Sequence, residues 1–173
     1  MRVFISGGCK NGKSTYGQYL AKEQGQPLYY IATMSAVDGE DEERIIRHQK
    51  EREGWGFTTI EQPTKIENIL QSCDINGSFL FDSLTALLAN EMFYSTGVDS
   101  KACERISNGL VQVLQKVKNI VIVSDYIYSD AFLYDGITEE YRKALAELDK
   151  LAAKNCDIVL EAAYTTILEV GHT

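Results

Sequence analysis

Four residues near the start of the chain have the types and spacing needed to bind phosphate groups. Gly7 and Gly12 are separated by four residues, and Lys13 and Ser14 follow at once. Glycines let the backbone curl so that successive N–H groups point at phosphate oxygens. Lys13 would reach the β- and γ-phosphates of a nucleotide, and the Ser14 hydroxyl would bind Mg²⁺.

The segments on either side of these residues have the composition of a strand and a helix. Residues 3–5 are β-branched or aromatic, and a helical pattern covers residues 15–23. A phosphate-binding P-loop requires this order, because the positive end of the helix dipole faces the anion. A glycine-rich turn that matched the motif by chance would need neither a preceding strand nor a following helix. The sequence therefore predicts a P-loop that binds a nucleoside triphosphate.

The rest of the chain alternates between strand-like and helix-like segments. This alternation predicts one domain over residues 1–173, with a three-layered α/β P-loop NTPase fold and a mostly parallel central sheet. The expected strands after the first are residues 28–32, 57–60, 79–82, 119–125, 157–160 and 165–168. The expected helices after the first are residues 40–53, 63–73, 83–93, 99–118 and 138–154.

Composition excludes several classes of function. The net charge of −8 argues against a general basic surface for nucleic acid. No apolar run approaches the length of a membrane span, and no secretory leader is visible. The four cysteines lack paired spacing, so we expect neither a disulfide nor a zinc framework, and we read Cys9 as a small filler. We expect a cytoplasmic protein that acts on small molecules.

Two acids follow strongly apolar strand segments. Asp82 ends the run at residues 79–82, where a Walker-B acid would order the Mg²⁺ shell. Its simpler interpretation is an acid at a helix N-terminus. Asp125 ends the run at residues 119–125 and is the rival candidate. We favour Asp82 for the metal because a phosphate loop is already present.

His48 lies in a strongly cationic segment. Taken alone, a histidine on a charged helix is usually just solvated. A cationic face would also suit a polyphosphate, and an imidazole there could attack phosphorus. The pattern leaves these two interpretations open. The surrounding cations are Arg44, Arg47, Lys50 and Arg52.

The chain resembles the adenosylcobinamide kinase / adenosylcobinamide-phosphate guanylyltransferase family of cobalamin synthesis. The resemblance rests on the P-loop sequence, on Tyr-Ile-Ala-Thr at residues 30–33, and on Arg-Ile-x-x-His at residues 44–48. It continues with Trp55 and Thr-x-Glu at residues 59–61, and later with Phe81-Asp82-Ser83-Leu84-Thr85 and Asn90. The match is good to about residue 95.

The resemblance implies that His48 attacks the α-phosphate of GTP and forms a covalent GMP-histidine, with Lys13 assisting. The GMP would then pass to adenosylcobinamide phosphate, and the kinase activity would phosphorylate adenosylcobinamide with GTP or ATP. It also implies Mg²⁺ bound by Ser14 and Asp82, and a small homo-oligomer such as a trimer. The residues implied to contact the nucleotide are Gly7, Gly8, Cys9, Lys10, Asn11, Gly12, Lys13, Ser14, Ser35, Ala36, Val37, Arg52, Glu53, Gly54, Trp55, Glu61 and Asp82.

The second half departs from the family pattern. Family members carry Asn-Glu-Val-Gly after the strand that ends near Ser124, and Arg-Asp-x-x-Gly-x-x-Asn-Gln on the following helix. Here the first stretch reads Asp-Tyr-Ile-Tyr, and the helix lacks the Gly, Asn and Gln. Two alternatives therefore stay open: a P-loop kinase of small molecules without guanylyl transfer, and a GTP-binding regulatory protein without turnover.

Overall fold

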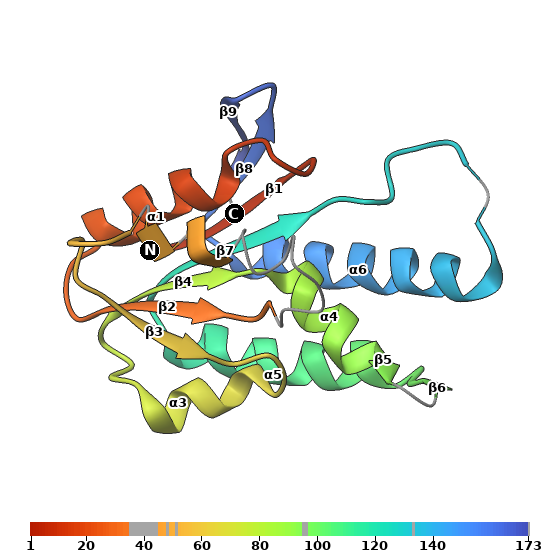
Figure 1. Cartoon of the computed structure of the whole chain (residues 1–173), viewed down its shortest axis with the longest axis horizontal. Helices are drawn as coiled ribbons and strands as arrows, with labels where there is room; N and C mark the ends of the chain where they lie inside the picture. The colour runs from red at the N-terminus through yellow and green to blue at the C-terminus, as the bar shows by residue number, and fades with distance from the viewer. Residues whose placement is uncertain (35–44, 48, 51, 95–96, 133, 173) are drawn as a thin grey trace.

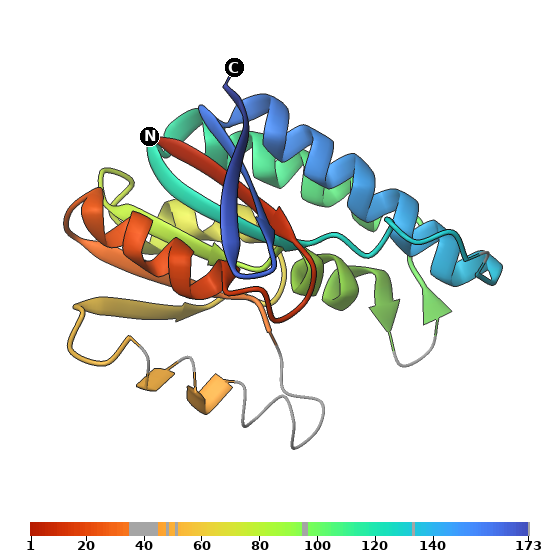
Figure 2. The ribbon, with the colours of Figure 1, turned by 90° about the horizontal axis from the view of Figure 1, so that it is seen from above.

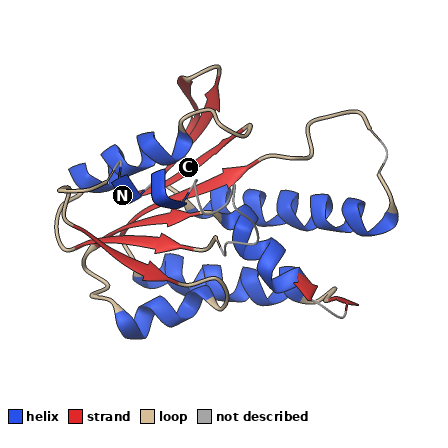
Figure 3. Cartoon of the chain, viewed as in Figure 1, coloured by secondary structure: helices blue, strands red, loops and turns tan. Residues whose placement is uncertain are grey.

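A computed structural model places seven strands in one twisted sheet with helices on both faces (Figures 1 and 3). The structure describes residues 1–34, 45–47, 49–50, 52–94, 97–132 and 134–172. The sheet order is β3-β2-β4-β7-β1-β8-β9. Every neighbouring pair is parallel except β8–β9, which is antiparallel. This confirms the predicted α/β fold with its mostly parallel central sheet.

The described elements follow the predicted alternation. The strands of the sheet are β1 (Arg2–Gly7), β2 (Leu28–Ala32), β3 (Phe57–Glu61), β4 (Ser78–Asp82), β7 (Asn119–Asp125), β8 (Ile158–Ala163) and β9 (Thr166–His172). The helices are α1 (Lys13–Glu23), the 3₁₀ turn η1 (Ile66–Asn68), α3 (Ile69–Ser72), α4 (Leu84–Met92), α5 (Ala102–Lys116) and α6 (Gly136–Asn155). A small hairpin of β5 (Phe93–Tyr94) and β6 (Gly97–Val98) was not predicted.

Some predicted boundaries were wrong. The helix predicted to begin at Asp99 begins at Ala102, because the Asp99 carboxylate accepts a hydrogen bond from the Lys101 N–H in a turn that precedes the helix. The helix predicted from residue 63 begins at Ile66 with a single 3₁₀ turn. Ser83 caps α4 as expected, since its hydroxyl accepts a hydrogen bond from the Ala86 N–H.

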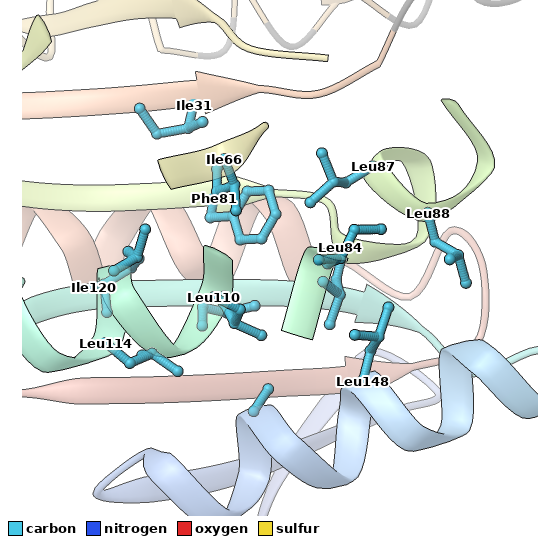
Figure 4. Packing of buried hydrophobic residues seen from close by; sticks show 14 of the residues in the cluster. Ile31, Ile66, Phe81, Leu84, Leu87, Leu88, Leu110, Leu114, Ile120 and Leu148 are labelled. Carbon is cyan, nitrogen blue, oxygen red and sulfur yellow. The ribbon is translucent and has the colours of Figure 1, made fainter. Parts of the chain in front are cut away.

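The alternation of side chains along the strands divides the core into two layers. Phe79 and Phe81 of β4 face α4, α5 and α6, whereas Leu80 between them faces α1. Figure 2 shows α1 and the α5–α6 pair on opposite sides of the strands, and Figure 4 shows Phe81 packed among Ile66, Leu84 and Leu110. These layers hold the carboxyl ends of β1, β4 and β7 together, where open α/β sheets bind ligands.

Candidate active site

The loop between β1 and α1 has the backbone of an anion-binding site. Gly12 adopts a left-handed conformation with φ of 80°, which favours glycine, and it precedes α1 without a side-chain cap. The first N–H groups of a helix have no partner within the helix. They therefore point, with the positive end of the helix dipole, at the space that a phosphate would occupy.

Gly7 has a reason to be glycine that the sequence did not suggest. A Cβ at this position would lie 2.4 Å from the Ala162 carbonyl oxygen on the neighbouring strand β8. Gly7 therefore lets β1 and β8 lie close together beneath the loop. The structure explains Gly12 by the curl of the loop and Gly7 by the packing of the sheet.

Lys13 is nearly buried and is held by two groups on the loop side of the sheet. Its Nζ donates to the Gly8 carbonyl oxygen at 2.6 Å and lies 2.7 Å from Oδ1 of Asp125. Asp125 stands at the end of β7, directly opposite Gly7 in the register of the two strands. The Lys13 ammonium group thus lies next to the phosphate loop, and a bound phosphate would compete with Asp125 for it.

One cavity joins the phosphate loop to both acids. Its lining contains the cations Lys10, Lys13 and Arg47 and the carboxylates of Asp82 and Asp125. The cations suit a phosphate chain, and the acids suit a divalent cation that bridges it. The full lining is Lys10, Asn11, Gly12, Lys13, Ser14, Thr15, Arg47, Asp82, Val123 and Asp125.

The side chains of Ser14 and Asp82 fit Mg²⁺ by their chemistry. Both provide hard oxygen donors on the same cavity. In the part of the chain that the structure describes, no cluster of three or more His, Cys, Asp or Glu residues could hold a metal by itself. Mg²⁺ typically uses one or two protein ligands together with water and substrate phosphates, so two oxygen donors such as Ser14 and Asp82 suit it.

The two candidate acids have different surroundings. Asp125 pairs with Lys13, whereas Oδ2 of Asp82 accepts a hydrogen bond from the Tyr30 hydroxyl at 2.8 Å. Because β7 lies between β4 and β1, Asp82 is one strand farther from the phosphate loop than Asp125. Lys13 engages Asp125, while a neutral hydroxyl group orients Asp82.

Hydrogen bonds of Thr33, Ser83 and Asn90 hold the ends of β2 and β4 together. The sequence presents these residues only as parts of motifs. The Thr33 hydroxyl donates to the Ser83 carbonyl oxygen at 2.7 Å and accepts from the Ser83 N–H at 2.6 Å. The Asn90 amide donates to the carbonyl oxygens of Thr33 and Pro63. These bonds fix the segment after Asp82, and the motif spacing was the only signal for them.

Residues 45–47 and 49–50 are helical, and Arg47 of this segment lines the cavity. The helical segment that contains Arg47 therefore lies beside the phosphate loop. His48 itself, and the predicted nucleotide contacts Ser35, Ala36 and Val37, lie outside the described residues.

Arg52 and Trp55, two of the predicted nucleotide contacts, pack against residues of neighbouring elements. The buried Arg52 guanidinium lies 3.9 Å from the centre of the Tyr30 ring. The Trp55 ring packs against Tyr19 of α1 and lies beneath the Lys22 ammonium. Neither residue lines the cavity described above.

Three further predicted contacts are solvent-facing or peripheral. Glu53 and Gly54 are exposed, and Glu61 is exposed at the end of β3. β3 is the edge strand of the sheet, and β2 and β4 separate it from β7. Their contact with a nucleotide, like that of every other residue of the predicted site, stays a prediction.

Comparison with known proteins decides the family. The model of the cobinamide kinase / cobinamide phosphate guanyltransferase family matches residues 3–167. The chain belongs to this family. It is 29% identical to the bifunctional adenosylcobalamin biosynthesis protein CobP of Pseudomonas aeruginosa over 92% of this chain and 91% of that protein. It is 30% identical to the bifunctional adenosylcobalamin biosynthesis protein CobU of Escherichia coli K12 over 66% of each.

Solved structures agree on the fold. The RadB recombinase gives a TM-score of 0.51 at 16% identity, over 92% of this chain and 72% of that one. A Pyrococcus horikoshii OT3 protein, the subject of a structural study of PH0250, gives the same TM-score at 12% identity, over 97% of this chain and 84% of that one. At these identities the likeness concerns the fold alone, and it agrees with the predicted three-layered α/β P-loop NTPase fold. No described helix is long and apolar enough to cross a membrane.

Two buried charged residues of α6, Arg142 and Asp149, contact the segment that follows β7. Arg142 of α6 donates to the carbonyl oxygens of Ile127 and Phe132 and pairs with Asp130, so it organises the loop between β7 and α6. Asp149, also on α6, accepts a hydrogen bond from the Tyr128 hydroxyl at 2.7 Å.

The same helix contacts the end of β7 beside the cavity. Burial raises the pKa of Asp149 to about 6, and the nearby Asp125 carboxylate adds to this, while hydrogen bonds from Ser124 and Tyr128 act in the opposite direction. The Tyr141 hydroxyl donates to the Thr85 carbonyl oxygen. Polar residues of α6 thus connect this helix to α4 and to the segment after β7.

Proposed function

We propose that this chain carries out both activities of its family on one phosphate loop. It phosphorylates adenosylcobinamide with a nucleoside triphosphate, and it transfers GMP from GTP to adenosylcobinamide phosphate through His48. The observation that carries this proposal is the cavity in which Lys13, Arg47, Asp82 and Asp125 meet at the end of the P-loop.

The phosphate chain is held by the loop and its cations. The backbone N–H groups that precede and begin α1 donate to phosphate oxygens, and Lys13 moves from Asp125 to the phosphates. Ser14 and Asp82 would hold Mg²⁺, which supplies charge neutralisation on the phosphate oxygens. Arg47 adds a cation from the side of the histidine segment.

Guanylyl transfer then takes two steps. A neutral His48 nitrogen forms a bond to the α-phosphorus of GTP, and the bond between that phosphorus and the bridging oxygen breaks to release pyrophosphate. A phosphate oxygen of adenosylcobinamide phosphate next attacks the same phosphorus, and the phosphorus–nitrogen bond breaks to free His48. The attacking nitrogen of His48 must be unprotonated for this step.

Intact-mass spectrometry after incubation with GTP and Mg²⁺ tests the histidine step. We expect a gain of one GMP that survives alkali, is lost in acid, and is absent from His48→Ala. Lys13→Ala should also lose the adduct, because the triphosphate is no longer held. No adduct on the native chain, under conditions in which GTP binds, would overturn guanylyl transfer and leave a P-loop kinase or a GTP-binding regulatory protein.

Two further expectations belong to the same proposal. The chain acts in the cytoplasm, where reducing conditions suit its thiols, and it forms a small homo-oligomer such as a trimer. Light scattering on the purified protein measures the second of these directly.

A further inference from the structure

Tyr30 occupies the middle of β2 and reaches across to the acid at the end of β4. Its side chain is almost fully buried, and its hydroxyl donates to Oδ2 of Asp82 at 2.8 Å. In the strand register Tyr30 lies opposite Leu80, two positions before Asp82. Tyr30 and Leu80 belong to the core layer on the α1 side of the sheet, so the hydroxyl approaches Asp82 from that face.

Two neighbours restrain the Tyr30 ring. The Arg52 guanidinium lies 3.9 Å from the ring centre, and the Phe57 ring meets it edge-on. Arg52 is itself 7% exposed, and its Nη2 donates to the Thr59 hydroxyl at 3.2 Å. A buried guanidinium fixed in this way holds the aromatic ring beneath it, and so fixes where the Tyr30 hydroxyl can point.

The electrostatics of this cluster agree with its geometry. Burial lowers the pKa of Arg52, and interactions with Tyr30 and Asp82 act in the opposite direction. Arg52, Tyr30 and Asp82 thus form one connected unit between the segment that carries Arg47 and the end of β4. A phenylalanine at position 30 would keep the ring packing, so only the hydroxyl requires tyrosine.

We infer that Tyr30 is a positioning residue that holds the Asp82 carboxylate in the orientation needed for the metal–nucleotide complex. This inference rests on the proposed role of Asp82 in holding Mg²⁺. One oxygen of Asp82 accepts a hydrogen bond from Tyr30, and Asp82 lines the cavity at the phosphate loop. Partners of metal-ligating carboxylates fix the orientation of the ligand, and their removal typically weakens metal affinity by about 10- to 100-fold.

The test is Tyr30→Phe, which removes the hydroxyl and keeps the ring beneath Arg52. We would use calorimetry to measure binding of a GTP analogue in which a methylene group replaces the oxygen that bridges the α- and β-phosphates, over a series of Mg²⁺ concentrations and in EDTA. We expect the Mg²⁺ concentration for half-maximal enhancement to rise by about tenfold. Affinity in EDTA and the melting temperature should stay close to those of the native chain.

Two further variants separate the possible outcomes. Tyr29→Phe is the matched control, because Tyr29 lies on the same strand and its hydroxyl accepts a hydrogen bond from the Asp74 backbone N–H, and neither residue lines the cavity. Its Mg²⁺ dependence should match that of the native chain. Asp82→Asn should lose most of the Mg²⁺ enhancement.

The results distinguish the inference from the proposal beneath it. If Asp82→Asn keeps the native Mg²⁺ dependence, the metal role of Asp82 is wrong. If Asp82→Asn loses the enhancement while Tyr30→Phe keeps native Mg²⁺ dependence, the metal role stands and the positioning role of Tyr30 is overturned. An equal loss of affinity for Tyr30→Phe in Mg²⁺ and in EDTA would also overturn it, since that is the effect of a structural role alone.

Discussion

Replacing Asp149 by asparagine should change the free energy of unfolding, relative to that of the native chain, in favour of the variant as the pH rises from acid to neutral. The Asp149 side chain is 3% exposed on α6, and burial raises its pKa from an ordinary value of 3.8 to about 6. A carboxyl with a raised pKa favours folding when it is protonated. Its contribution is complete below about pH 4 and is lost as the pH rises to about 6.

The size of the effect follows from this shift. A shift of about two pKa units corresponds to about 3 kcal/mol between the fully protonated and fully ionised limits. Since the unfolded chain is already partly ionised at pH 4, roughly 2 kcal/mol should be lost between pH 4 and pH 7.5. Asparagine keeps an oxygen that can accept from Tyr128, and any cost of its buried NH₂ group does not depend on pH.

Urea unfolding at pH 4 and pH 7.5 measures the difference. We expect the free energy of unfolding of Asp149→Asn, relative to the native chain, to increase by roughly 2 kcal/mol between the two pH values. Glu140→Gln removes an exposed carboxyl from the same helix and controls for the loss of one negative charge. A difference that is the same at both pH values would refute the reasoning, because a buried carboxyl with a raised pKa must produce a slope.

Three other substitutions test other parts of the account. Gly7→Ala places a Cβ 2.4 Å from a backbone oxygen of β8 and should cost about 1 to 3 kcal/mol in urea unfolding, whereas Gly136→Ala, which meets open space, should cost far less. Arg142→Ala should make the loop between β7 and α6 cleave faster in limited proteolysis, and unchanged cleavage would contradict its organising role. Arg52→Lys loses the planar stack on Tyr30, so its Mg²⁺ dependence should shift; a loss of GTP affinity in EDTA as well would reveal a direct nucleotide contact.

The helices and strands were predicted well because each of them depends on residues that are neighbours in the chain. The apolar run at residues 119–125 and the Gly7-to-Ser14 motif each occupy one continuous stretch, and both fold as expected. The hairpin at Phe93 was missed because Met92 and Phe93 continue the apolar spacing of α4. Helical spacing does not indicate where the chain turns away from the core.

The contacts that build the site were not predictable, since they join residues far apart in the chain. Tyr30 meets Asp82 across 52 positions, and the choice between Asp82 and Asp125 depends on the order of strands. Lys13 was predicted to reach phosphate, but its pairing with Asp125 required β7 to lie beside β1. The family motif at residues 30–33 indicated that these residues mattered without indicating what they contact.

The central claim is that one phosphate loop serves two reactions and that His48 serves only the second. Chromatography with mass detection of the corrinoid products, after incubation with adenosylcobinamide, ATP, GTP and Mg²⁺, tests it most directly. The native chain should form adenosylcobinamide-GDP, His48→Ala should stop at adenosylcobinamide phosphate, and Lys13→Ala should form neither. Formation of adenosylcobinamide-GDP by His48→Ala, or of the phosphate alone by the native chain, would contradict the account.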